Sequence, residues 1–188
     1  MSKASIAKAD YGSIYGDYSR FSECDLNNRQ LRETGALPAA GMKHQAISLK
    51  IAAALLEYVE DGKHGCVLQA PCGVVLSRKV IQSDVLFIAK ERRGIIGKAG
   101  LYAAPDLIVD LLSPRMQERE LRVKKRLYAF YEVKEYWIAD PEDSTIEVLL
   151  WSELGYLSIG KYDKKDRLSS PLLPDLNLPL LRVFGNEE

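Results

Sequence analysis

The stretch APDLIVDLLSP, residues 104–114, has the composition of a buried β-strand but carries two acidic side chains. Asp106 and Asp110 are four residues apart, and residues two or four apart in a strand point to the same face of a sheet. An unpaired buried charge costs several kcal/mol, or its pKa shifts until the group is neutral. The pattern therefore predicts that a group of opposite charge lies against these carboxylates.

The segments that follow this strand indicate its neighbour in the sheet. Residues 116–132 have a helical pattern, and EYWIAD at 135–140 has the pattern of a second buried strand. A helix between two buried strands is typical of a βαβ crossover, in which the strands are parallel. We therefore expect an α/β or α+β fold with a mixed central sheet.

The rest of the chain adds one helix and several short strands. A helix is predicted over residues 42–61, where apolar residues recur at helical spacing. Short β-rich runs occupy 66–89, a glycine-rich basic loop follows at 91–100, and a terminal hairpin is expected over 145–160. The Pro- and Leu-rich tail, 172–184, is expected to lie irregularly over the core.

Residues 1–41 carry several tyrosines among polar residues and are predicted to form an N-terminal arm, with 42–188 as one domain. The 188 residues include 26 basic and 26 acidic side chains, so no overall positive charge draws the protein to nucleic acid. Three cysteines match no disulfide framework or zinc-binding spacing, which favours a reducing compartment. Because we find no signal peptide or membrane span, we expect a cytoplasmic protein without a membrane partner.

A further acid is expected beside the first strand. Asp84 lies in KVIQSDVLFIAK, residues 79–90, a strand-like run that should neighbour the strand of Asp110. Mg²⁺ takes oxygen ligands and is often held by one or two carboxylates together with water and a substrate phosphate. Asp84 and Asp110 are therefore the predicted metal ligands.

The predicted helix supplies a cation to the same place. On a helical wheel its apolar residues cover about half of the circumference, and Lys124 falls near the centre of that half. An ammonium there would offset transition-state charge and orient or help deprotonate an attacking water. Structural alternatives stay open: Asp84 as a turn acid bonded to backbone N–H groups, Asp110 in a buried ion pair, and Lys124 as a side chain whose end reaches water.

These residues belong to motifs that resemble a known family. The resemblance covers about residues 42–183 and is to the Uma-two family, a branch of the PD-(D/E)XK nuclease superfamily. Three motifs carry it: PDLIVDLLSP (105–114), LRVKKRLYAFYEVKEYWIADP (121–141) and LPDLNLPL (173–180).

The resemblance implies a role for each matched residue. Asp84 and Asp110 match the family's two acids, and Lys124 with Tyr128 matches its helix-borne lysine and tyrosine. The superfamily usually has its lysine two residues after the second acid, where this chain has Leu112. The resemblance to the Uma-two family implies that the helix supplies the lysine instead. Asp110 stands where glutamate is usual, so the carboxylate is one methylene shorter.

The resemblance also implies the fold, the cofactor and the partners. The fold is a restriction-endonuclease-like core, a central mixed β-sheet flanked by helices, with extra C-terminal strands. The cofactor is Mg²⁺, with Mn²⁺ as a substitute and no organic cofactor. The substrate is DNA, and a homodimer is expected because two-fold symmetry suits the cutting of two strands.

Other residues are expected to support the site or to contact nucleic acid. His44, which is otherwise a capping or packing residue, is a candidate supporting residue, as are Tyr128, Asp106 and Glu33. Asp106 follows Pro105 and is expected at the rim of the site. Basic side chains of the loop and the helix are expected to contact phosphates without reading sequence: Arg92, Arg93, Lys98 and Arg122.

Together these features predict a Mg²⁺-dependent DNA endonuclease. One alternative is a catalytically degenerate nucleic-acid-binding or regulatory protein on the same fold, which the aspartate in place of glutamate favours. Another is an interaction protein that assembles through residues 1–41.

Overall fold

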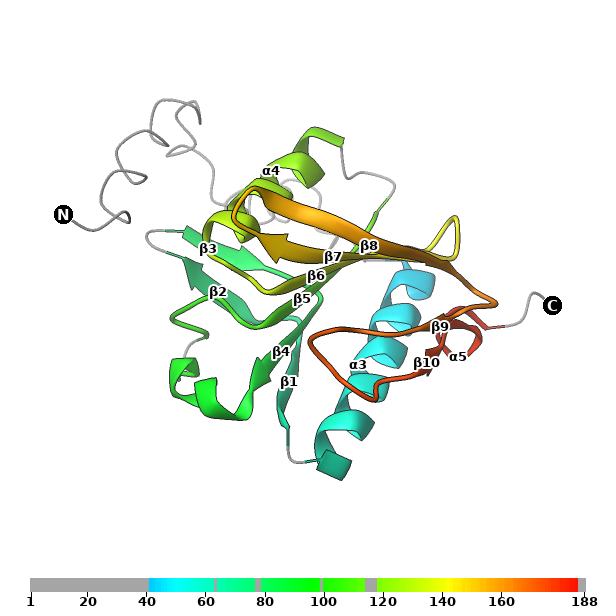
Figure 1. The fold of residues 1–188 in the computed structure, drawn as a ribbon, viewed down its shortest axis with the longest axis horizontal. Coiled ribbons are helices and arrows are strands. Elements are labelled where there is room, and N and C mark those ends of the chain that lie inside the picture. The colour runs from blue at the N-terminus through cyan, green and yellow to red at the C-terminus, as the bar shows by residue number, and fades with distance from the viewer. Residues whose placement is uncertain (1–40, 63, 77–78, 99, 114–117, 186–188) are drawn as a thin grey trace, which may run out of the picture. The chain divides into compact units, whose positions relative to one another are not determined.

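Figure 1 shows the fold of the protein, a computed structural model. The structure describes five segments of the chain: residues 41–62, 64–76, 79–98, 100–113 and 118–185. The predicted arm, residues 1–41, lies outside these segments apart from Gly41, and the candidate residue Glu33 lies outside them as well. No helix within the segments is long and apolar enough to cross a membrane.

A six-stranded sheet forms the centre of the domain. Its strands in spatial order are β1 (Gly65–Gln69), β4 (Val85–Ala89), β5 (Leu107–Leu111), β6 (Glu135–Asp140), β7 (Thr145–Ser152) and β8 (Gly155–Asp163). β5 and β6 run parallel and are connected through α4 (Glu118–Phe130), whereas every other neighbouring pair is antiparallel. The predicted crossover and mixed sheet are confirmed.

The central strand β5 is buried on both faces, which explains its nearly continuous apolar sequence. Its odd-numbered residues pack with α3 (Met42–Gly62), and the even-numbered Ile108 packs in a separate cluster with Tyr128 of α4. In Figure 1, α4 lies at the top, above the strands, and α3 lies below β7 and β8, beside β1. Asp110 is even-numbered, so this alternation directs its side chain toward α4.

The strand-like run expected over residues 79–90 consists of two strands, β3 (Lys79–Gln82) and β4, separated by a bend. β2 (Gly73–Leu76) and β3 form a hairpin whose buried residues pack on the α4 side of the sheet. Ser83 and Asp84 then separate β3 from β4. Asp84 therefore lies at the end of a strand, where its side chain can reach the edge of the sheet.

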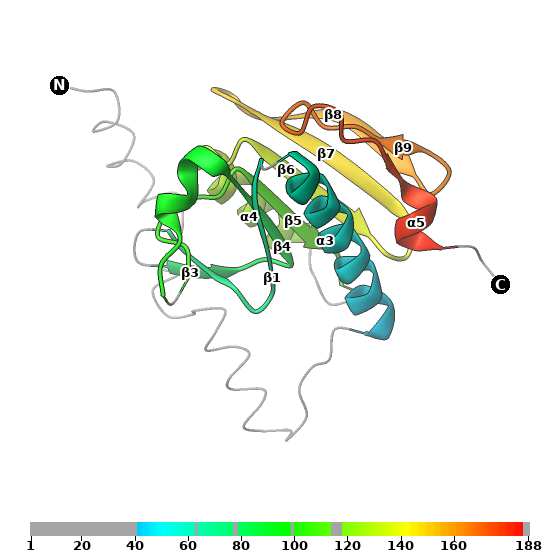
Figure 2. The same ribbon diagram turned by 90° about the horizontal axis from the view of Figure 1, so that it is seen from below.

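The C-terminal tail is irregular only in part: residues 172–177 form bends and a turn over the core, as expected, whereas residues 178–184 form a short strand and a short helix. β9 (Arg167–Leu168) pairs with β10 (Leu178–Pro179), and the short helix α5 (Leu180–Phe184) follows. Buried apolar side chains hold this segment in the cluster on the α3 side: Leu168, Leu173, Leu176, Leu178, Leu180 and Val183. Figure 2 shows α5 beside α3.

Candidate active site

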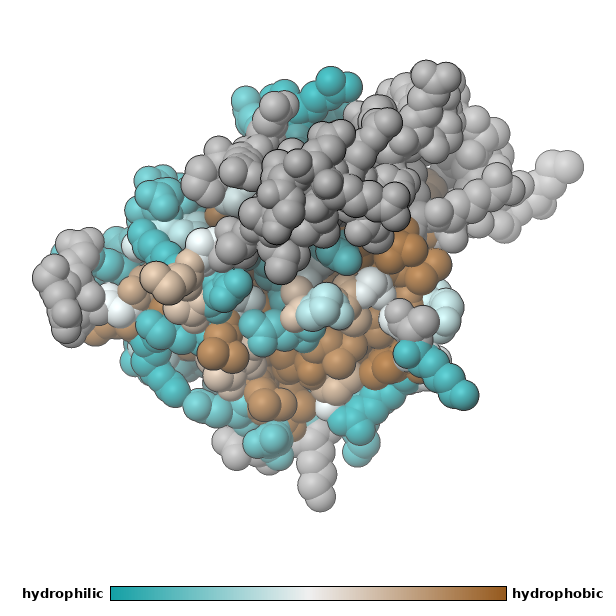
Figure 3. All heavy atoms as spheres, turned by 180° about the vertical axis from the view of Figure 1, so that it is seen from behind, coloured by the Kyte–Doolittle hydropathy of each residue, from teal (hydrophilic) through white to brown (hydrophobic). Residues whose placement is uncertain are grey.

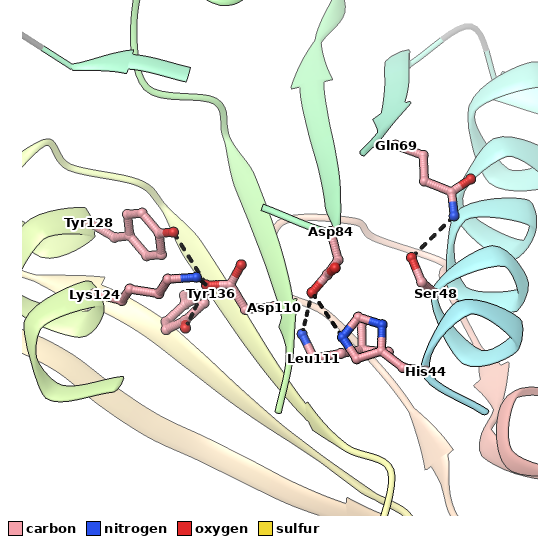
Figure 4. Close-up of polar contacts among 9 residues, drawn as sticks. All are labelled: His44, Ser48, Gln69, Asp84, Asp110, Leu111, Lys124, Tyr128 and Tyr136. Carbon is pink, nitrogen blue, oxygen red and sulfur yellow. Dashed lines mark hydrogen bonds and ion pairs between the residues drawn. The ribbon is translucent and has the colours of Figure 1, made fainter. Parts of the chain in front are cut away.

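Asp110 is the buried acid at the centre of the site (Figure 4). It is 1% exposed. Its Oδ2 accepts hydrogen bonds from the hydroxyls of Tyr128 (3.2 Å) and Tyr136 (2.9 Å), and Nζ of Lys124 lies 3.5 Å from the same oxygen. The other oxygen, Oδ1, is buried and accepts no hydrogen bond within the described segments. One oxygen of this carboxylate thus lacks the partner that a buried charge requires.

Asp84 lies beside Asp110 at the end of the neighbouring strand. Val85 is paired with Val109 in the antiparallel register of β4 and β5, so the position before Val85 comes next to Asp110. The backbone N–H of Leu111 donates a hydrogen bond of 2.7 Å to Oδ2 of Asp84. Two carboxylates from adjacent strands therefore lie at the same end of the sheet, Asp110 directed toward α4 and Asp84 toward Leu111 and His44 (Figure 4).

The surroundings of Asp84 disfavour its charged form. Burial raises the pKa of Asp84 above its usual value, and the nearby charge of Asp110 adds to this effect. The Leu111 N–H, His44 and Lys124 act in the opposite direction without cancelling the effect of burial. A divalent cation would reverse the balance, since it stabilises the ionised carboxylates.

We expect Asp84→Asn to stabilise the metal-free protein at neutral pH by about 1 kcal/mol, or about 2–4 °C in Tm. Because its pKa is raised, folded Asp84 binds more protons than unfolded Asp84 just above the ordinary pKa. Ionised Asp84 thus costs stability at neutral pH, and the cost disappears as the pH falls below that ordinary value. Asparagine keeps an oxygen acceptor for Leu111. Melting curves in EDTA, compared between neutral and acidic pH, measure the difference, and an asparagine variant less stable than wild type at neutral pH would contradict it.

α4 brings Lys124 and Tyr128 to Asp110 from one side of the helix. The two residues are four apart, so they lie one turn from each other on the same face. The Lys124 side chain is only 12% exposed, and Tyr128 is fully buried with its hydroxyl 3.1 Å from the Ser83 hydroxyl. The structure therefore brings together Asp84, Asp110, Lys124 and Tyr128, which the sequence motifs had singled out.

Tyr136 of β6 is a site residue that the sequence patterns did not predict. Burial, followed by the charge of Asp110, raises the pKa of Tyr136 well above its usual value, so its hydroxyl stays protonated and donates to the carboxylate. The sequence EYWIAD (135–140) already contained the pattern that places Tyr136 in the site. Asp110 pairs with Ile138 across the parallel strands, and residue alternation then puts Tyr136 on the face of Asp110.

α3 borders the site on the side of Asp84. His44, a predicted supporting residue, has its Nε2 3.8 Å from Oδ2 of Asp84. Ser48 lies one turn further along α3 and accepts a hydrogen bond of 3.1 Å from the Gln69 amide of β1. Figure 4 shows these α3 side chains facing the strand ends, opposite the α4 residues. The site is thus enclosed by helices from both faces of the sheet.

Asp106 is fully buried, so the expectation that it lies at the rim of the site is wrong. Its Oδ1 lies 3.0 Å from Nη1 of Arg92 and 2.8 Å from Nζ of Lys134, and its Oδ2 accepts a hydrogen bond of 2.9 Å from the Ala89 N–H. Burial raises the pKa of Asp106, but these partners outweigh it and hold the pKa below its usual value. The two acids of residues 104–114 therefore differ in their charged neighbours: both Oδ1 atoms are buried without a hydrogen bond from the described residues, but that of Asp106 lies against two cations.

The four basic residues expected to contact nucleic acid have different surroundings. Arg92 and Arg93 lie on η2 (Lys90–Ile95), a 3₁₀ helix in the segment expected to be a loop, and each donates to a backbone carbonyl of the domain. Lys98 is exposed. Arg122 is exposed and pairs at 2.7 Å with an acid one turn earlier on α4. Three of the four thus have intramolecular partners.

The carboxylates of Asp84 and Asp110 fit a divalent metal ion. Within the described segments, no group of three His, Cys, Asp or Glu side chains is arranged to hold a metal. Mg²⁺ needs only one or two carboxylates when water and a substrate phosphate complete its coordination. The buried Oδ1 of Asp110, which accepts no hydrogen bond from the described residues, has the chemistry of a ligand atom.

Comparisons with known proteins identify the family of the chain and a similar fold. The model of the Uma2 family, described as "Putative restriction endonuclease", matches residues 32–181, which confirms the resemblance seen in the motifs. The crystal structure of a "putative nuclease belonging to DUF820" from Anabaena variabilis is similar, with a TM-score of 0.65 and 16% sequence identity over 78% of this chain and 83% of that chain. This likeness confirms the expected fold, a mixed sheet flanked by helices. No curated protein matches the chain.

Proposed function

Because the chain belongs to the Uma2 family, we propose that it is a metal-dependent endonuclease that hydrolyses phosphodiester bonds in DNA. In this proposal Asp84 and Asp110 hold Mg²⁺ or Mn²⁺, and Lys124 is the catalytic cation. The observation that carries it is the buried Asp110 Oδ1, which accepts no hydrogen bond within the described segments, beside a second carboxylate and an ammonium group. A metal ion would remove the cost of burying that oxygen without a partner.

In this proposal the two oxygens of Asp110 have different roles, one toward the protein and one toward the metal. Tyr128, Tyr136 and Lys124 hold Oδ2, which orients the carboxylate and leaves Oδ1 for the metal. Bound there, the ion would polarise a phosphoryl oxygen and lower the pKa of a coordinated water. The Lys124 ammonium would orient the attacking water and offset the negative charge that develops on the phosphoryl group.

A nucleic-acid-binding protein without catalytic activity is the second candidate. The observation that favours it is the ion pair at 3.5 Å between Lys124 and Asp110, which neutralises part of the cluster without a metal. The two candidates differ in their response to Mg²⁺. A metal that binds the folded state raises Tm with concentration, whereas a degenerate site leaves Tm unchanged.

A plasmid-nicking assay tests the proposed activity. We expect wild-type protein to convert supercoiled plasmid to nicked and linear forms in Mg²⁺ or Mn²⁺ but not in EDTA. Single-stranded DNA and RNA in parallel reactions would define the substrate. Preparations of Asp110→Asn and Lys124→Met made in the same way control for contaminating nuclease. Absence of cleavage on every substrate with both metals would overturn the proposal.

A further inference from the structure

α3 has two apolar faces, although a helix on the surface of a domain needs only one. The first face packs on the sheet through Ile47, Ile51, Leu55 and Val59. The second is a row of exposed residues, termed the α3 stripe: Met42, Ala46, Leu49, Ala53 and Leu56. Its three large side chains are 89%, 60% and 45% exposed, in chain order. Figure 3, which views the molecule from behind, shows a patch of hydrophobic residues, in brown, on that face.

The spacing of the α3 stripe is that of a helix–helix interface. Its members alternate at intervals of four and three residues, as in the seam of a coiled coil, and large residues alternate with alanines. Nothing in the packing of α3 on the sheet requires this second row, because other residues fill that interface. We propose that the α3 stripe binds α3 of a second copy of this chain, in antiparallel orientation, to form a homodimer.

The stripe is complementary to itself only when the two helices are antiparallel. In that orientation Leu49 of one copy lies opposite Ala53 of the other, and Leu56 lies opposite Ala46. These two inner layers each combine one large and one small side chain, which lets the two backbones approach there. At each end of the row, Met42 of one copy lies opposite Glu60 of the other. A parallel pair would place leucine against leucine and alanine against alanine, so the layers would alternate between crowded and empty.

The charges beside the stripe favour the same orientation. Lys43 and Lys50 lie in the N-terminal half of α3, and Glu57 and Glu60 lie in its C-terminal half. Antiparallel packing brings Lys43 of one copy beside Glu60 of the other, and it places the positive end of each helix dipole near the negative end of its partner. Lys50, near the centre of this register, has its Nζ beside Gly185 of its own chain.

Neighbouring residues widen the surface on one side. Leu181 of α5 is 48% exposed, and Arg182 next to it pairs with Glu57 of α3 at 3.0 Å. α5 is therefore fixed against α3 and adds apolar surface beside the stripe. A second copy is favoured over residues 1–40 or a different protein because the four inner residues of the α3 stripe match themselves in side-chain volume and the flanking Lys43 and Glu60 match in charge.

The mass of the full-length protein in solution tests the proposal. We expect wild-type protein at tens of micromolar to sediment as a dimer, and Leu49→Glu to weaken the dimer at least about a hundredfold because it buries a charge in the interface. Leu157→Glu is the matched control, since Leu157 is 57% exposed on β8, and it should remain dimeric. Melting curves verify that each variant is folded. A monomeric wild type, or a dimeric Leu49→Glu, would overturn the proposal.

Disulfide cross-linking tests the orientation separately. Leu49→Cys and Ala53→Cys proteins, mixed and oxidised, should form a linked heterodimer, because these positions face each other only between antiparallel copies. Either variant alone should form no link at its new cysteine. Peptide mapping separates the new link from links through the native cysteines. Self-linkage of each single variant would indicate a parallel pair and contradict the inference. Neither measurement depends on nuclease activity.

Discussion

Asp110→Asn is expected to lower the rate of metal-dependent DNA cleavage by about a thousandfold or more. The substitution keeps the size of the side chain and an acceptor for Tyr128 and Tyr136, but it removes the charge that would hold the metal. It also removes the carboxylate charge 3.5 Å from the Lys124 ammonium, whose side chain is only 12% exposed. We therefore expect a loss of about 2 kcal/mol in the free energy of unfolding and no rise in Tm on addition of Mg²⁺.

Three further variants separate the charge of Asp110 from the surrounding structure. Asp143→Asn makes the same chemical change at an exposed turn and should cleave DNA like wild type. Tyr136→Phe removes one hydrogen bond to Oδ2 but keeps the carboxylate, so it should retain the Mg²⁺-linked rise in Tm. Asp110→Glu restores the residue usual in the family and should remain active. Full activity of Asp110→Asn would remove Asp110 from the proposed site.

Short-range periodicity explains why much of the site could be predicted. Strand alternation identified Asp110 as a buried acid, and the helical wheel identified Lys124 as a cation on an apolar face. The strand–helix–strand order then required β5 and β6 to be parallel, which puts α4 on one face of the sheet. Each step depends on residues close together in the sequence, where geometry follows from secondary structure alone.

Residues whose role depends on distant partners could not be predicted in this way. Asp106 follows a proline at a strand entry and has the local pattern of an exposed acid. Its burial depends on Arg92 from η2 and Lys134 from the turn after α4, which meet only in the folded domain. Tyr136 similarly required the register of β5 with β6. The leucines of the tail recur with neither the strand period nor the helix period. Burial in the apolar cluster on the α3 side of the sheet holds them in place, and that contact forms only in the folded domain.

Lys124→Met is expected to reduce cleavage by about a hundredfold to a thousandfold while leaving metal binding intact. Methionine fills most of the same space but carries no charge to offset the transition state. The ammonium currently lowers the pKa of Asp84 and pairs with Asp110, so the two carboxylates should repel each other more strongly without it. Metal-free Lys124→Met should therefore melt below wild type, and Mg²⁺ should raise its Tm at least as much as that of wild type.

Low cleavage together with a retained Mg²⁺-linked rise in Tm would distinguish a catalytic role of Lys124 from a purely structural ion pair. If Lys124 served only to neutralise Asp110, a bound Mg²⁺ would replace it and Lys124→Met would cleave DNA normally at saturating metal. If Lys124 acts on the phosphoryl group, cleavage stays low at any Mg²⁺ concentration. The adjacent Lys125→Met provides the matched control. Lys125 pairs with Glu147 at 3.4 Å and is partly exposed, so its loss should cost about 0–1 kcal/mol in stability and change cleavage less than about threefold.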